Sequence, residues 1–257
     1  MRQISPSEIE RAFRKGCLEI DFPAEPFDSI GGLLIRATRL FFANLPFLAA
    51  VTLAVLIPAK LALQFACYLL DVPPEGVVSY FVMDFGDLIF SALVMPAAIY
   101  GLVINLRTGK PCPLGDALRW GRRQWAKTLW NKFKVEITIM LWGALLIVPG
   151  IVAMVRLIFT DTIVAIEGDR ENQVLQRSRE LSEGRRWRIF LSLLPALPLS
   201  FAHMYATLRA LQYSRWLMVP VDSLFSVLDH WMTVVVLLIY LGLWTPRTTE
   251  AAKRKAA

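Results

Sequence analysis

Long apolar stretches recur along this chain and are separated by short segments rich in Lys and Arg. A helix needs about 20 mostly apolar residues to cross the hydrocarbon core of a bilayer, and several of the stretches reach that length. The chain is 56% apolar and only 19% charged, whereas a soluble domain is about half apolar and a quarter charged. The pattern predicts an all-α fold, a polytopic integral membrane helical bundle.

Five apolar stretches predict about six transmembrane helices. The stretch 137–166 would form a helix of about 45 Å, which is too long for one perpendicular span, and Pro149-Gly150 is a strong turn signal within it. We expect two short helices packed as a hairpin there, with a re-entrant loop as the alternative. Lys60 follows the first span and is expected to reach the outer surface with its long side chain. Single spans are expected at 40–59, 88–106, 189–208 and 224–244.

The basic residues predict the orientation. With both termini on the cytosolic side, 24 of the 28 Lys and Arg residues lie on that side, as the positive-inside rule requires. The exceptions are Lys60, Arg156, Arg209 and Arg215. Topology then accounts for the net charge of +7, so nucleic acid is not needed as a partner, and we expect a multi-pass protein of the bacterial inner membrane.

Polar segments flank the predicted membrane domain. We expect residues 1–39 to be a cytosolic or interfacial helical segment, 40–245 the six-helix domain, and 246–257 a short basic cytosolic tail. Ser5-Pro6-Ser7-Glu8 is typical of a helix start. Similar Arg-bearing segments precede three of the apolar stretches, which suggests three hairpins, each introduced by an amphipathic helix at the inner surface.

Trp and Arg alternate in two of the basic segments. Such a pattern suits a helix lying on anionic headgroups with Trp at the interface, so membrane lipids are the expected partners. The candidate lipid-contacting residues are Arg119, Trp120, Arg122, Arg123, Trp125, Arg185, Arg186 and Trp187. Ala97 and Gly101, small residues four apart, are compatible with a homo-oligomer or with another membrane protein as partner.

A few ionisable residues fall inside the predicted spans: Arg156, Asp161, His203 and Asp229. Each costs at least about 2.5 kcal/mol in a bilayer unless it is paired or hydrated. Arg156 and Asp229 are predicted at similar depths, which suggests an ion pair between their helices. Asp161 is expected either to face a wet cavity or to join a buried hydrogen-bonded network.

No motif predicts catalysis, a cofactor or a metal ion. His203 and His230 have no nearby Cys or Glu at metal-ligand spacing, and His230 beside Trp231 suggests an interfacial position. Cys17, Cys67 and Cys112 offer neither a zinc site nor a disulfide framework. Asp84-Phe85-Gly86 matches the kinase magnesium motif by letters only; Asp84 and Asp87 are expected to cap the outer end of a span.

Residues 147–190 resemble a bacterial family. The residues that carry the resemblance are Ile147-Val148-Pro149-Gly150-Ile151, Arg156-Leu157, Ile166-Glu167-Gly168 and the segment from Leu175-Gln176-Arg177-Ser178 to Trp187-Arg188-Ile189-Phe190. They are similar to the YciC-like inner-membrane proteins and to the related membrane domain fused to some glycerophosphodiester phosphodiesterases. Asp161 departs from that pattern, in which an apolar residue is usual. The resemblance implies a six-helix membrane domain without catalytic residues, since those of the fused proteins lie in a separate soluble domain.

Two functions follow from these patterns. The preferred one is non-enzymatic: a scaffold, assembly factor or lipid-interacting module of the cell envelope. The alternative is a small transporter or channel that uses Arg156, Asp161 and Asp229. A transporter requires a hydrated cavity that reaches Asp161, whereas a scaffold requires a dry core.

Overall fold

The computed structural model describes residues 29–73, 76–167 and 173–256, with side chains up to residue 243. These parts of the chain are helical and contain no strand, which confirms the all-α prediction. The helices are α2 (Ile30–Leu69), α3 (Val77–Thr108), α4 (Leu114–Leu145), α5 (Ile147–Leu157), α6 (Thr160–Glu167), α7 (Val174–Ser182), α8 (Arg186–Leu193), α9 (Ala196–Tyr213) and α10 (Arg215–Ala256). The predicted helix start at Ser5 and the thiol of Cys17 lie outside the described residues.

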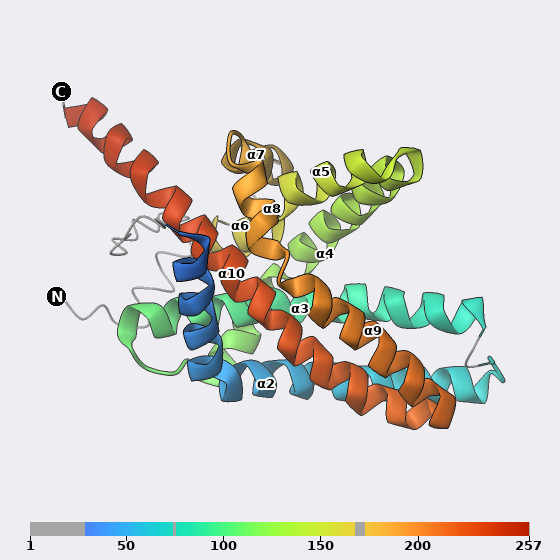
Figure 1. The fold of residues 1–257 in the computed structure, drawn as a ribbon. Coiled ribbons are helices and arrows are strands. Elements are labelled where there is room, and N and C mark those ends of the chain that lie inside the picture. Colours follow the sequence, from blue (N-terminus) through green and yellow to red (C-terminus); the bar gives the residue numbers. More distant parts are fainter. Residues whose placement is uncertain (1–28, 74–75, 168–172, 257) are drawn as a thin grey trace.

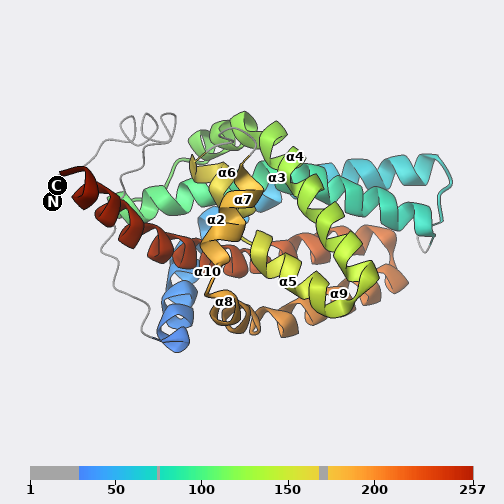
Figure 2. The same ribbon diagram turned by 90° about the horizontal axis from the view of Figure 1, so that it is seen from above.

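The helices form antiparallel pairs. Helices α2, α3, α9 and α10 run side by side along the long dimension of the molecule (Figures 1 and 2), with α2 packed on both α3 and α10. Helix α4 packs on α3, and α5 and α6 return along α4. In Figure 1 the tip of the α4–α5 hairpin stands clear of the four long helices.

Within the described residues, four segments are long and apolar enough to cross a membrane: α2, α3, Val148–Glu167 and Arg215–Leu243. Helices α8 and α9, bent by 44° at the break beside Pro195, provide a fifth if they count as one span. Helix α4 does not pass this test. The prediction of several helices long and apolar enough to cross a membrane is therefore confirmed, and the number six and the amphipathic helices stay predictions.

The helix ends follow from local chemistry. Ser29 caps α2, its Oγ accepting a hydrogen bond from Gly32 N at 3.1 Å, which satisfies one of the free amides of the first turn. Helix α3 ends at Gly109, whose φ of 64° lies in the left-handed region that glycine adopts without a Cβ penalty. Figure 1 shows α2 bent after its first turns, and Pro46 within the helix removes a backbone hydrogen bond in this part of it.

The break in 137–166 lies three residues before the expected place. Leu146 is extended, with φ −159° and ψ 143°, and separates α4 from α5. Pro149 falls in the first turn of α5, where its missing N–H costs nothing. Gly150 permits close packing within the hairpin. A Cβ at this position would lie 2.9 Å from Gly143 Cα, so helices α4 and α5 approach closely at these two glycines.

Ser178 of α7 holds the junction between α5 and α6. Its Oγ donates to Arg156 O at 2.9 Å and accepts from Phe159 N at 3.2 Å. One hydroxyl thus satisfies two backbone groups that the helix break leaves unpaired. This gives a physical role to the serine of the family-like segment.

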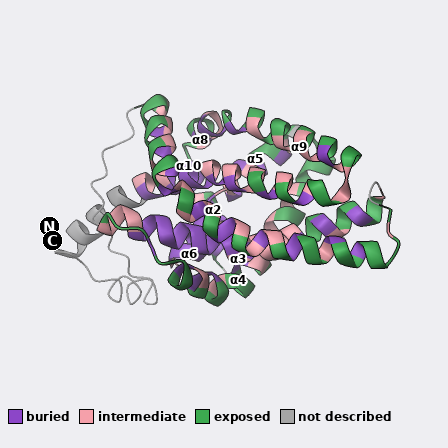
Figure 3. Cartoon of the chain, turned by 90° about the horizontal axis from the view of Figure 1, so that it is seen from below, coloured by how far each residue is buried: buried purple, intermediate pink, exposed green. Residues whose placement is uncertain are grey.

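One half of the bundle is densely packed. Figure 3 shows the buried residues gathered around α2, α3, α6 and α10, away from the α2–α3 turn. Glycines permit the close packing: a Cβ on Gly121 of α4 would lie 2.5 Å from Leu93 O and 3.0 Å from Ala97 Cβ, and one on Gly101 would collide with the ring of Phe47. Ala97 and Gly101 are therefore used inside the chain, and the prediction that they form a self-association face is wrong.

Large apolar side chains cover much of the outer surface. Examples on four different helices are Phe42, Phe81, Met140 and Phe201, each more than half exposed. Soluble monomers rarely expose so much contiguous apolar surface. Together with the apolar helices, this surface indicates insertion into a membrane.

Candidate functional site

A cavity of about 690 Å³ lies between α2, α3, α4, α9 and α10. It occupies the half of the bundle nearer the α2–α3 turn, because Phe81 and Asp84 near the start of α3 and Met140 near the end of α4 line it. The packed core described above closes the other end. The polar side chains that line the cavity are Thr52, Asp84, Asp87, Ser91, Lys132, Glu136, His203, Ser226, Asp229, His230 and Thr233.

Five charged or titratable side chains form a continuous chain along this cavity. Lys60 Nζ lies 2.9 Å from Asp87 Oδ1 and also pairs with Asp222. His203 Nε2 lies 2.8 Å from Asp222 Oδ1, and its Nδ1 lies 3.0 Å from Asp229 Oδ2. The chain Asp87–Lys60–Asp222–His203–Asp229 thereby joins α3, α2, α10 and α9.

The middle of this chain is buried and its ends are open. The Lys60 side chain is 3% exposed and that of Asp222 13%, whereas those of Asp87 and Asp229 are 42% and 43% exposed. A buried ammonium ion is tolerated only with close partners of opposite charge, and two carboxylates meet that need for Lys60. The expectation that Lys60 reaches the outer surface is wrong, because α2 continues as a helix for nine residues beyond it.

His203 is held between two carboxylates and stacks on Phe225, with ring centroids 5.1 Å apart. A neutral imidazole carries one N–H, whereas the imidazolium ion donates from both nitrogens. Two carboxylate partners therefore fit the charged ring. His203 then contributes a positive charge to the cavity wall.

Carboxylates dominate the charge of the cavity. Asp84, Asp87, Glu136 and Asp229 line it, against Lys132 and the charged ring of His203. Lys60 and Asp222 balance each other behind the wall. A narrow space with low-dielectric walls and an excess of one sign concentrates ions of the opposite sign, so this cavity favours cations.

Asp161 lies near the cavity without lining it. Its Oδ2 lies 3.5 Å from Lys132 Nζ, and the same ammonium group donates to Ser91 Oγ at 3.1 Å. Lys132 itself lines the cavity. Asp161 therefore belongs to a hydrogen-bonded network that positions the ammonium group of Lys132 at the cavity wall.

The predicted pair of Arg156 with Asp229 does not form. Asp229 is bonded to His203, and the buried Nε of Arg156 has no hydrogen-bond partner among the described residues. The pair was predicted because both residues were expected at similar depths in the membrane, but depth does not decide which helices are neighbours. Helix α5 packs on α4, α7 and α8, which places Arg156 away from α10.

His230 is buried, which corrects its expected interfacial position. The residue is 5% exposed, and its Nε2 lies 2.8 Å from Thr52 Oγ1. Asp84 and Asp87, expected as caps at the outer end of a span, line the cavity together, as their spacing of three residues on one helix face allows.

The lipid-contact candidates divide into two groups. Trp120 is only 4% exposed: its Nε1 donates to Ala165 O at 3.2 Å and its ring stacks on Tyr100, so the prediction for this residue is wrong. Trp125 is more exposed, although its Nε1 donates to Ile89 O. The other exposed candidates are Arg119, Arg122, Arg123, Arg185 and Trp187, and Arg186 is half-buried.

The cluster of Lys60, Asp87 and Asp222 was not predicted from the sequence. The sequence signal that could have placed Lys60 is the mostly apolar stretch 61–69 that follows it. Such a lysine lies within a span rather than at its end. Among the residues with described positions, no group of three His, Cys, Asp or Glu side chains is placed to hold a metal ion.

Comparison with known proteins adds no family assignment. No protein-family model, curated protein or solved structure matches this chain. The resemblance of residues 147–190 to the YciC-like proteins therefore rests on those residues alone.

Proposed function

We propose that this protein is a multi-pass transporter of the bacterial inner membrane that takes up a small cationic solute through the cavity between α3, α4 and α10. The observation that carries the proposal is the chain Asp87–Lys60–Asp222–His203–Asp229, of which Asp87, His203 and Asp229 line a 690 Å³ cavity. Ionisable groups are costly inside a bilayer and commonly mark substrate or ion pathways. A chain of five such groups goes well beyond what helix packing requires.

The asymmetry of the bundle supports transport. The cavity lies toward the α2–α3 turn, while the opposite half, around Tyr100 and Trp120, is closed by packed side chains. Alternating access requires one open and one closed side at a time. If the positive-inside rule sets the orientation, the open side faces outward, and α4 supplies a sixth span whose polar face, with Lys132 and Glu136, lines the cavity.

The scaffold or lipid-interacting module remains a second candidate. The exposed Arg119, Arg122 and Trp187 favour it, since Arg and Trp suit contact with anionic headgroups. A scaffold has no need for unbalanced carboxylates around an internal cavity, which is why transport is preferred.

Uptake into proteoliposomes tests the proposal. Vesicles with an inside-negative potential are incubated with radiolabelled methylammonium, choline or putrescine. We expect potential-driven uptake of at least one of these cations, reduced roughly tenfold or more by Asp229→Asn, which weakens cation binding at the cavity wall. The control is Asp116→Asn, an exposed carboxylate outside the cavity. Absence of uptake for all three cations, or equal uptake by Asp229→Asn and wild type, contradicts the proposal.

A further inference from the structure

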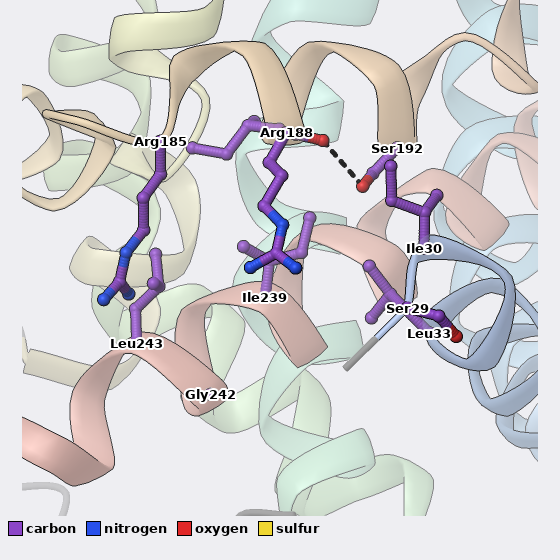
Figure 4. A pocket seen from close by; sticks show the side chains of 10 residues that line it. Ser29, Ile30, Leu33, Arg185, Arg188, Ser192, Ile239, Gly242 and Leu243 are labelled. Carbon is purple, nitrogen blue, oxygen red and sulfur yellow. Dashed lines mark hydrogen bonds between the residues drawn. The ribbon is translucent and has the colours of Figure 1, made fainter. Parts of the chain in front are cut away.

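A second cavity, of about 240 Å³, lies at the other end of the bundle between the start of α2, helix α8 and the part of α10 that contains Ile239 and Leu243. Figure 4 shows its lining side chains, with those of Arg185 and Arg188 extending from the start of α8 toward α10. The sequence patterns predict lipid contact for Arg185 but include neither Arg188 nor a cavity, and no residue of the transport cavity belongs to this site.

The charged side chains that line the second cavity are basic, among the residues that the structure describes. Arg185 and Arg188 line it, and no described acidic residue does. Both are exposed, and neither forms an ion pair with any residue that the structure describes. Two guanidinium groups on one cavity wall offer the fork geometry that binds phosphate oxygens bidentately.

The start of α2 adds to this positive field. Ser29 and Ile30 line the cavity, and the first turn of α2 carries no acidic residue. The N-terminal end of a helix bears a partial positive charge and exposed amides that favour anions. A 40-residue helix and two arginines thus converge on the same space.

The remaining walls are mostly apolar, and the hydroxyl of Ser192 donates to the backbone oxygen of Arg188. Leu33, Ile189, Ile239 and Leu243 line the cavity beside the arginines. A soluble phosphate would leave these walls uncovered, whereas a lipid would place its headgroup at the arginines and its first methylene groups against Ile239 and Leu243. The side chains of the cavity match an amphiphilic anion.

We propose that Arg185 and Arg188 bind the phosphate group of an anionic membrane phospholipid in this cavity. Paired guanidinium groups would recognise the phosphate oxygens of a free phosphate ion as well as those of a lipid. The apolar walls of the cavity favour the lipid. A lipid bound there bridges α2, α8 and α10 at the end of the bundle away from the transport cavity. The site stands independently of the transport function.

Lipid binding to the delipidated full-length protein in detergent tests the proposal. Phosphatidylglycerol is titrated and bound lipid is counted by native mass spectrometry, with phosphatidylcholine as the zwitterionic comparison. We expect the double variant Arg185→Gln/Arg188→Gln to bind phosphatidylglycerol roughly tenfold more weakly than wild type. The matched control, Lys127→Gln/Arg179→Gln, removes two exposed basic residues of α4 and α7 that do not line the cavity and should change affinity less than threefold.

The second part of the experiment measures competition between inorganic phosphate and phosphatidylglycerol. Phosphate at millimolar concentration should displace little phosphatidylglycerol, because it gains nothing from the apolar walls. If phosphate competes as tightly as the lipid binds, the assignment to a lipid is overturned. Equal loss in both double variants, or no loss in either, overturns the site itself.

A third variant tests the proposal if Arg185→Gln/Arg188→Gln does not fold. Arg185→Lys/Arg188→Lys keeps both charges but loses the bidentate geometry. We expect a several-fold loss of phosphatidylglycerol affinity for it, with phosphatidylcholine binding unchanged. Wild-type affinity in this variant contradicts recognition by paired guanidinium groups.

Discussion

The ammonium group of Lys60 on α2 lies 2.9 Å from the Asp87 carboxylate on α3 and pairs at the same time with Asp222 on α10. One buried cation therefore holds three helices of the bundle together. Removing it leaves Asp87 without its counter-ion and leaves Asp222 with His203 as its remaining charged partner. Breaking a buried ion pair in this way is more costly than replacing the whole pair.

We expect Lys60→Met to lower the free energy of unfolding by about 3 kcal/mol, measured by chemical denaturation in mixed micelles. Adding Asp222→Asn to Lys60→Met should restore part of the loss, since it removes one of the two carboxylates that Lys60 neutralises. The control, Lys127→Met at an exposed position on α4, should stay within about 0.5 kcal/mol of wild type. A Lys60→Met protein as stable as this control contradicts the paired, buried lysine.

A double-mutant cycle separates the two partners considered for Asp229. His203 lies 3.0 Å from the Asp229 carboxylate, so His203→Gln and Asp229→Asn should show a coupling energy of about 1 kcal/mol or more. Arg156 and Asp229 belong to helices that are not packed together, so Arg156→Gln and Asp229→Asn should be additive within about 0.5 kcal/mol. Coupling between Arg156 and Asp229, together with additivity for His203 and Asp229, would instead support the pair predicted from depth alone.

Two glycines of α4 give opposite predictions for the same substitution. A Cβ at Gly121 lies 2.5 Å from the backbone oxygen of Leu93, whereas one at Gly115 meets nothing within 4 Å. Gly121→Ala must push α4 away from α3 and should cost about 1–3 kcal/mol of stability. Gly115→Ala should leave stability unchanged or raise it by up to about 1 kcal/mol. Equal effects of the two substitutions would contradict the close packing of α3 on α4.

The thiol of Cys112, between α3 and α4, is predicted to react slowly. Burial raises the pKa of Cys112 to about 12, and the nearby charge of Asp116 acts in the same direction. The thiolate is the nucleophile, so at pH 8 the reactive fraction is about a thousandfold smaller than that of an ordinary cysteine with a pKa of about 8.5. In a Cys17→Ser/Cys67→Ser background, alkylation by iodoacetamide at pH 8 should be slow and should accelerate up to pH 11. Labelling at the rate of a free thiol would show that Cys112 is not buried.

The membrane class of the fold was predictable because it depends on local hydropathy. Apolar runs long enough to span a bilayer leave few alternatives to a helical bundle. Helix boundaries were less predictable: α2 was expected over 40–59 but extends over Ile30–Leu69, since residues of mixed polarity on either side also favour helix. The break before α5 falls at Leu146 because Pro149 is well accommodated in a first helical turn.

The residues of the candidate site were predictable in part. His203 and Asp229 stand out as polar groups in apolar runs, and both belong to the charge chain. Their partners were not predictable, because pairing depends on which helices are neighbours, and hydropathy carries no such information. Lys60 was misplaced for a related reason: a lysine at the end of a predicted span can reach the surface by snorkelling, and only the continuation of α2 shows that it cannot.

The most direct test of the account is the access of charged reagents to the transport cavity in membrane vesicles. In a cysteine-free background, Ser226→Cys places a thiol in the cavity wall, and Ser223→Cys places one three residues away at a fully buried position. A cationic methanethiosulfonate should modify Ser226→Cys at least about tenfold faster than an anionic one, because the carboxylates concentrate cations, and Ser223→Cys should react with neither. Equal rates for the two reagents, or a Ser226→Cys protein as inert as Ser223→Cys, would contradict a hydrated, cation-selective cavity and the transport function built on it.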